Sequence, residues 1–176
     1  DISAKHIAEK LSTSLSAPSG REQRPEVDIL EQLSQLITPL INGLGDADRI
    51  LANLSRFLAA ARAPQSWVSL FLRDRDALEI LCKLFATSQY MAEILIQDPD
   101  AFDYLRIVSG QPLDRELIRK ELHESIGAVT NFTAAMKLLR DFRHREILRI
   151  AYGDFIQNQP LELVTEQISE LTETII

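Results

Sequence analysis

The sequence contains a single cysteine, Cys82, among 176 residues. One thiol excludes an internal disulfide and a cysteine-based metal cluster within these residues. Cys82 lies among four apolar residues, Ile80, Leu81, Leu84 and Phe85, so we expect a small buried side chain rather than a nucleophile. A protein with so little cysteine is expected in the cytoplasm.

Long apolar runs and an excess of positive charge are also missing. No run approaches the roughly 18 apolar residues that span a bilayer, and the first residues do not combine a basic region with an apolar block, so we predict neither a membrane span nor a secretory signal. The 19 basic residues are outnumbered by 26 acidic ones, for a net charge of −7. This charge argues against a nucleic-acid-binding domain, which needs a cationic surface.

Strand patterns are nearly absent, whereas helical spacing of apolar residues recurs along the chain. We predict an all-α fold, an irregular multi-helix bundle with short connections. Residues 1–20 are expected to form an N-terminal helix and a flexible connection, and residues 26–176 one helical domain. Pro39 should kink or shorten a helix over residues 27–41.

Several residues are typical of helix starts. Asp46 is a plausible cap, either Asp74 or Arg75 should begin a helix, and either Thr87 or Ser88 should cap another. A further helix should start at Leu113 or Asp114. Pro64 and Pro160 suit first helical positions.

A long central helix is predicted over about residues 128–157. At about 100° per residue, one face carries seven apolar residues: Phe132, Ala135, Met136, Leu139, Phe142, Ile147 and Ile150. We expect this face to pack on a core. Arg143 and Glu146 fall in the same arc one turn apart, which predicts a buried ion pair between them. Replacing Glu146 with alanine should then leave Arg143 without its ion-pair partner and destabilise the domain by roughly 3 kcal/mol.

The C-terminal segment is predicted to be an amphipathic helix. Its apolar stripe is expected to comprise Leu161, Val164, Ile168, Leu171 and Ile175. Four glutamates lie largely on the other side: Glu162, Glu166, Glu170 and Glu173. They form either a solvated face or a row facing Arg140, Arg145 or Arg149 of the preceding helix.

No catalytic pattern is recognisable in these residues. Phosphoryl and nucleotidyl transfer need carboxylates that hold Mg²⁺ beside the phosphate, commonly with a glycine-rich approach. The nearest stretch, residues 43–48, is better explained as a turn and helix cap. The three histidines lack metal-ligand spacing. We therefore assign no catalytic, cofactor-binding or metal-binding residue here.

Two stretches carry a family resemblance. The first reads Phe142-Arg143-x-Arg145-Glu146-x-Leu148-Arg149-Ile150-Ala151, followed after a short break by Leu161-Glu162-x-Val164-Thr165-x-x-x-Ser169-x-Leu171. It resembles the helical stretch ahead of a nucleotidyltransferase domain in the glutamine synthetase adenylyltransferase/adenylyl-removing enzymes. Residues 84–92 with Asp98-Pro99-Asp100 are similar to the N-terminal region of the same family. Together the stretches cover roughly residues 48–176.

The resemblance implies a parent enzyme, a nucleotidyltransferase of nitrogen-metabolism regulation that uses ATP and Mg²⁺. It would transfer AMP to a tyrosine of glutamine synthetase and remove it by phosphorolysis, under control of glutamine and a PII-type signalling protein. This segment would be a framework that packs on the enzyme's own nucleotidyltransferase domain. Seven residues carry over as framework: Phe142, Arg143, Arg145, Glu146, Leu148, Arg149 and Ile150. The alternative is a non-enzymatic helical protein-interaction module.

Overall fold

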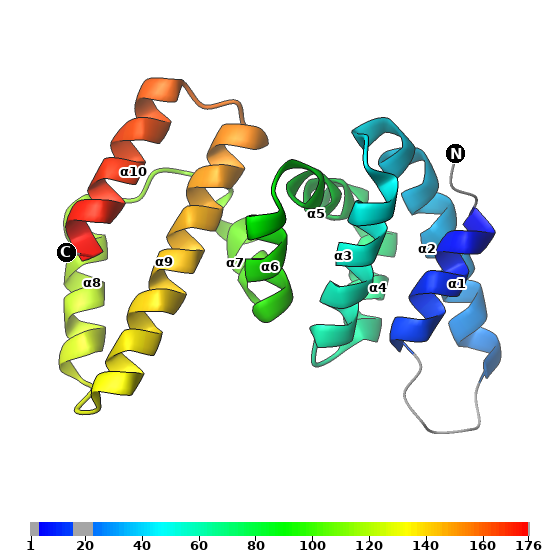
Figure 1. The fold of residues 1–176 in the computed structure, drawn as a ribbon, viewed down its shortest axis with the longest axis horizontal. Helices are drawn as coiled ribbons and strands as arrows, with labels where there is room; N and C mark the ends of the chain where they lie inside the picture. The colour runs from blue at the N-terminus through cyan, green and yellow to red at the C-terminus, as the bar shows by residue number, and fades with distance from the viewer. Residues whose placement is uncertain (1–3, 16–22, 176) are drawn as a thin grey trace. The chain divides into compact units, whose positions relative to one another are not determined.

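The computed structural model describes residues 4–15 and 23–175, which form ten α-helices and no strand (Figure 1). The all-α prediction is confirmed. In chain order the helices are α1 (Ala4–Leu15), α2 (Gln23–Leu44), α3 (Ala47–Ala60), α4 (Pro64–Arg73), α5 (Arg75–Thr87), α6 (Gln89–Gln97), α7 (Ala101–Val108), α8 (Arg115–Gly127), α9 (Phe132–Phe155) and α10 (Leu161–Ile175). The predicted flexible connection falls largely on residues 16–22, outside the described part of the chain.

The helix starts follow the capping residues. Asp46, Asp74 and Ser88 each accept a hydrogen bond from the backbone N–H three residues later, and Asp114 accepts two at the start of α8. These bonds satisfy N–H groups that have no partner inside the helix. Pro64 is the first residue of α4, as predicted. α10 begins one residue after Pro160.

Pro39 does not end α2, which continues to Leu44. A proline inside a helix removes the donor that the carbonyl four residues earlier would use. Here that carbonyl belongs to Gln35, and both Gln35 and Pro39 are exposed, so water can satisfy it. α2 instead ends before Gly45, whose φ of +102° is readily adopted only by glycine.

The chain divides into two compact units, Asp1–Phe102 and Asp103–Ile176. The first is built around aromatic side chains. The Phe57 ring lies 5.2 Å from Trp67, 6.1 Å from Phe85 and 6.4 Å from Phe102, all in edge-on arrangements that suit the quadrupoles of the rings. Cys82 is buried in the same unit, where desolvation raises the pKa of its thiol to about 12.

A polar clamp joins α3 to α6 in this first unit. Arg56 donates two hydrogen bonds to the Glu93 carboxylate, at 2.6 and 2.7 Å. Gln89 donates a third to Glu93 at 2.7 Å and bonds Asn53 of α3. These hydrogen bonds, above all those from Arg56, lower the pKa of Glu93 to about 2.

In the second unit, α8, α9 and α10 run side by side (Figure 1). The central helix α9 is shorter than the predicted range of 128–157, because Asn131 caps it by accepting a hydrogen bond from the Thr133 N–H. Beyond its C-terminal end, Asn158 has a φ of +53°, a left-handed conformation that turns the chain towards α10. None of the described helices is both long enough and apolar enough to span a membrane.

Candidate functional site

The most distinctive feature of the second unit is an ion pair inside its core. Glu146 and Arg149 are only 4% and 3% exposed. Both Nε and Nη2 of Arg149 lie 2.9 Å from Oε2 of Glu146. A buried charge is strongly unfavourable unless it is paired and hydrogen-bonded, so the rest of the site must satisfy these two groups.

The predicted pair between Arg143 and Glu146 is wrong, because Arg143 is exposed. Glu146 has an arginine three residues away on either side, and helical spacing favours both equally. Glu146 pairs with Arg149 rather than with Arg143 because two further hydrogen-bond acceptors lie beside the Arg149 guanidinium. Its Nη1 donates to the Gln111 carbonyl oxygen at 2.9 Å and to Gln167 Oε1 at 2.5 Å.

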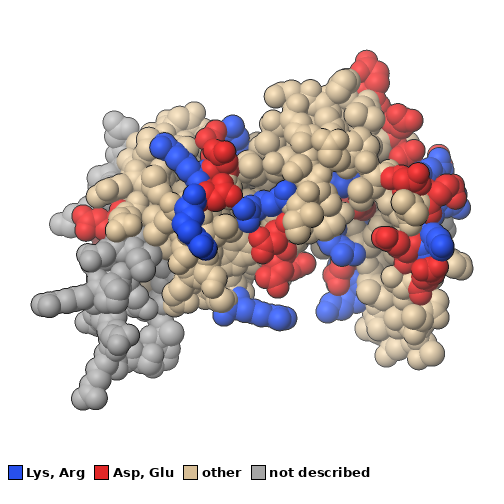
Figure 2. Space-filling model, turned by 180° about the vertical axis from the view of Figure 1, so that it is seen from behind, with Lys and Arg blue, Asp and Glu red and all other residues tan. Residues whose placement is uncertain are grey.

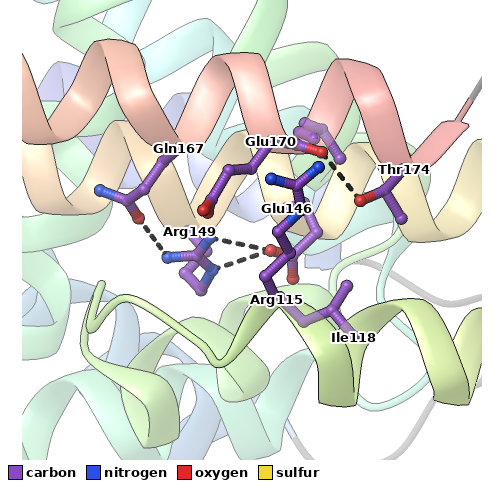
Figure 3. A pocket seen from close by; sticks show the side chains of 8 residues that line it. Arg115, Ile118, Glu146, Arg149, Gln167, Glu170 and Thr174 are labelled. Carbon is purple, nitrogen blue, oxygen red and sulfur yellow. Dashed lines mark hydrogen bonds and ion pairs between the residues drawn. The ribbon is translucent and has the colours of Figure 1, made fainter.

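The network extends from the pair to two more helices and a loop. The Tyr104 hydroxyl of α7 donates to Glu146 Oε1 at 3.3 Å. Gln111 belongs to the loop between α7 and α8, and Gln167 belongs to α10 (Figure 3). The pair on α9 therefore holds α7, this loop and α10 in one arrangement.

A chain of glutamines continues the network at the α9–α10 connection. Gln167 Nε2 donates to Gln159 Oε1 at 3.1 Å, and Gln159 Nε2 donates to the Gly110 carbonyl oxygen at 2.9 Å. Backbones approach closely here. A Cβ on Gly110, which has a φ of +67°, would lie 2.7 Å from the Gly153 nitrogen. Glycine is thus required at residue 110 on two counts.

Two side chains contact Tyr104, one at its hydroxyl and one over its ring. Its hydroxyl bonds Glu146, and the Arg145 guanidinium lies 5.8 Å from the ring centroid, a cation–π geometry. Burial and the nearby Glu146 charge raise the pKa of Tyr104 to about 12. Tyr104 is therefore a neutral hydrogen-bond donor at physiological pH.

The seven framework residues are not gathered in one place. Four are buried: Glu146, Leu148, Arg149 and Ile150. Phe142 is half-buried, whereas Arg143 and Arg145 are exposed. The prediction that the apolar face of this helix packs on a core is also wrong at the start of α9, since Phe132 is 79% and Met136 44% exposed.

The predicted stripe of α10 is partly wrong too. Val164 is buried, but Leu161 is 73% and Ile168 51% exposed. The missed inward residue is Gln167, which follows Val164 by three positions and precedes Leu171 by four, a spacing that could have identified it. Among the glutamates, Glu173 pairs with Arg115 of α8 rather than with an arginine of α9.

A small cavity adjoins the ion pair, between α8, α9 and α10 (Figure 3). Its volume of about 20 Å³ suits one water molecule and no nucleotide. It is lined by Arg115, Ile118, Glu146, Arg149, Gln167, Glu170, Leu171 and Thr174. Two guanidinium groups beside the carboxylates do not fit a Mg²⁺ site, and Glu146 already accepts two hydrogen bonds, from Tyr104 and Arg149, besides its ion-pair contact with Nη2 of Arg149.

The other carboxylate candidates have partners of their own. Asp46 of the glycine-containing turn caps α3, and Asp48 pairs with Lys10 at 3.1 Å. Among the described residues, no group of three histidine, cysteine, aspartate or glutamate side chains is placed to hold a metal ion.

The model of the glutamate-ammonia ligase adenylyltransferase family matches residues 78–176, which include the whole buried network. The chain belongs to this family. The bifunctional glutamine synthetase adenylyltransferase/adenylyl-removing enzymes of Thioalkalivibrio sulfidiphilus and Hahella chejuensis are each 28% identical to it, over 162 and 166 residues. The enzyme of the same name from Shewanella oneidensis is 30% identical over 89 residues.

These matches cover much more of this chain than of the relatives. The first two take in 90% of the chain but only 16% and 17% of the relatives' own lengths, and the third takes in 51% and 9%. The chain thus spans about a sixth of the first two relatives. No solved structure matches it.

Proposed function

We propose that this chain is a helical framework segment of a longer enzyme that adenylylates glutamine synthetase and removes the adenylyl group. Family membership over residues 78–176 and the names of the relatives support this assignment. In the complete protein, the segment holds the elements around the Glu146–Arg149 pair in a fixed arrangement. A nucleotidyltransferase domain outside residues 1–176 would pack on it.

The observation that carries the framework role is the commitment of the buried charges to protein partners. Arg149 bonds Glu146, Gln111 and Gln167, and Glu146 also accepts from Tyr104. A side chain that binds a substrate needs free hydrogen-bonding capacity facing an accessible space. This pair instead uses its bonds to fix α7, α9 and α10.

The remaining parts of the proposal concern the complete protein. ATP and Mg²⁺ would bind outside this segment, because no group of three histidine, cysteine, aspartate or glutamate side chains among the described residues is placed to hold a metal ion. Glutamine synthetase would be the substrate, and a PII-type protein would regulate the reaction. A cytoplasmic location belongs to the same proposal.

The test compares the 176-residue chain with the complete protein encoded by its reading frame. Each is incubated with glutamine synthetase, ATP and Mg²⁺, and intact mass reports the addition of AMP. We expect modification by the complete protein and none by the 176-residue chain. Metal-dependent turnover by the chain alone would overturn the framework assignment. A complete protein that leaves glutamine synthetase unmodified would overturn the enzymatic one.

The protein-interaction alternative is favoured by one observation, the exposure of large apolar side chains such as Phe132 on α9. A purely non-enzymatic module predicts that the complete protein binds partners without modifying glutamine synthetase. The same mass measurement therefore separates the two functions.

A further inference from the structure

Only the C-terminal half of α9 is covered on all sides. Seven of the eight residues from 146 to 153 are buried, whereas none from 132 to 145 is. Tyr104 of α7 and the loop containing Gln111 cover part of this half, and α10 covers the rest. Gln167 of α10 bonds Arg149, and Thr174 of α10 lines the same small cavity as Glu146. Thr174 is next to the last residue of α10, so residues 132–145 of α9 extend roughly 20 Å beyond the end of its neighbour.

The uncovered half of α9 presents an apolar stripe. Phe132, Met136, Leu139 and Arg143 follow one another at intervals of one helical turn and therefore share a face. Phe132 is 79% and Met136 44% exposed, and Leu139 is only half-buried. We name these three apolar residues the α9 stripe.

In the sequence around the α9 stripe, one end has no charged residue and the other end carries two arginines. Residues 125–136 contain no charged side chain, and the end of the α8–α9 hairpin is accordingly free of red and blue atoms at the lower right of Figure 2. Arg140 and Arg143 then flank the stripe. Both are exposed, and neither forms an ion pair with a described carboxylate.

The covered half of the same helix shows what kind of element fits. α10 is amphipathic, carries four glutamates and contains neither lysine nor arginine. Its apolar and amide side chains face α9, and Glu173 binds an arginine. An acidic helix with apolar residues one turn apart would meet the α9 stripe and its two arginines in the same way.

We propose that in the complete protein an acidic amphipathic helix, from the part of the polypeptide outside residues 1–176, packs on the α9 stripe and pairs with Arg140 and Arg143. The inference rests on the proposed function, since it takes this chain as a segment of a longer enzyme. The relatives, which are about six times as long as the matched region, show that the family has ample polypeptide to supply such a helix.

Thiol alkylation tests the proposal without reference to activity. Met136→Cys places a reporter on the stripe, and the native Cys82 gives little background because it is buried with a raised pKa. Peptide mapping after a pulse of iodoacetamide follows residue 136 alone. We expect alkylation in the complete protein to be about tenfold slower, or more, than in the 176-residue chain. Asp141→Cys, exposed on the opposite side of α9, is the matched control and should react alike in both.

Charge reversal tests the acidic character of the partner. Arg140→Glu combined with Arg143→Glu should restore fast alkylation of residue 136 in the complete protein and change nothing in the 176-residue chain. Equal, fast alkylation in both proteins would overturn the proposal. Protection that survives charge reversal would overturn the acidic partner, and protection of the 176-residue chain that grows with its concentration would assign the stripe to a second copy instead.

These outcomes are separate from the test of the proposed function. A complete protein that modifies glutamine synthetase but leaves residue 136 reactive would refute only the helix packing. A protein that protects residue 136 but modifies nothing would refute only the enzymatic role.

Discussion

At the residue scale, Arg149 contributes more to the stability of the fold than the nearby Arg143. Arg149 is buried against Glu146, Gln111 and Gln167, whereas Arg143 lies in solvent. Removing one partner of a buried ion pair leaves the other charge without compensation. Removing an exposed side chain leaves no such charge behind.

Glu146→Ala should therefore lower the free energy of unfolding by about 3 kcal/mol, because it leaves the Arg149 guanidinium buried without its carboxylate. Arg143→Ala is the matched control and should change it by less than about 0.5 kcal/mol. Urea unfolding followed by circular dichroism measures both. Equal effects of the two substitutions would show that the buried pair has been assigned to the wrong residues.

The lowered pKa of Glu93 predicts that acid destabilises the first unit. Its pKa is lowered to about 2 from an ordinary value of 4.5, so the folded state binds its proton less tightly than the unfolded state. The stabilisation by the ionised carboxylate is complete above pH 4.5 and is lost as the pH falls towards 2.

Glu93→Gln should accordingly lower the melting temperature at neutral pH, and the difference from wild type should shrink through that acid range. Thermal unfolding at a series of pH values provides the measurement. Carboxyl chemical shifts of Glu93 give an independent check, and a titration midpoint near the ordinary value would contradict the clamp with Arg56.

At the scale of elements, the connection between α9 and α10 depends on close backbone contact. Gly153 lies inside α9, where alanine would normally be favoured by about 0.5–1 kcal/mol. A Cβ at this position would lie 2.6 Å from the side chain of Gln159. Gln159 would have to move and give up its bond to the Gly110 carbonyl.

Gly153→Ala should for this reason destabilise the protein by about 1–3 kcal/mol despite its better helix propensity. Gly127→Ala, at the end of α8 with no atom within 4 Å of a new Cβ, is the control and should be neutral or stabilising. Chemical denaturation of the two variants compares them. Stabilisation by both alanines would mean that Gln159 does not hold the connection.

The elements themselves were largely predictable, because their signals are local. Asp46, Asp74 and Ser88 cap helices as expected, since a cap needs only a short polar side chain before the first turn. The expectation that Pro39 shortens its helix is wrong, because the cost of the proline depends on whether water reaches the freed carbonyl of Gln35, which the sequence does not state. Leu161 and Ile168 were misjudged because helical spacing does not reveal which side of α10 has a neighbour.

At the scale of the whole molecule, the two compact units have separate cores. The single tryptophan, Trp67, lies in the aromatic core of the first unit, against Phe57. The Glu146–Arg149 network lies entirely in the second unit. The fluorescence of Trp67 therefore reports on one unit, and circular dichroism reports on both.

Glu146→Ala should shift the unfolding transition seen by circular dichroism to lower urea while leaving the Trp67 fluorescence transition nearly unchanged. Wild-type protein measured with both probes provides the reference. An equal shift of both transitions would show that the two units unfold as one cooperative body.

Helical periodicity and local capping residues determined the all-α class and most helix starts, because these depend on neighbours within a few residues, and the resemblance of two short motifs indicated the family. The tertiary structure decided which charge is buried. Arg143 and Arg149 are equivalent by spacing, and the choice rests on the Gln111 carbonyl and Gln167, 38 and 18 residues away from Arg149. Partners so distant along the chain are brought together only by packing, so no local pattern pairs them with Arg149.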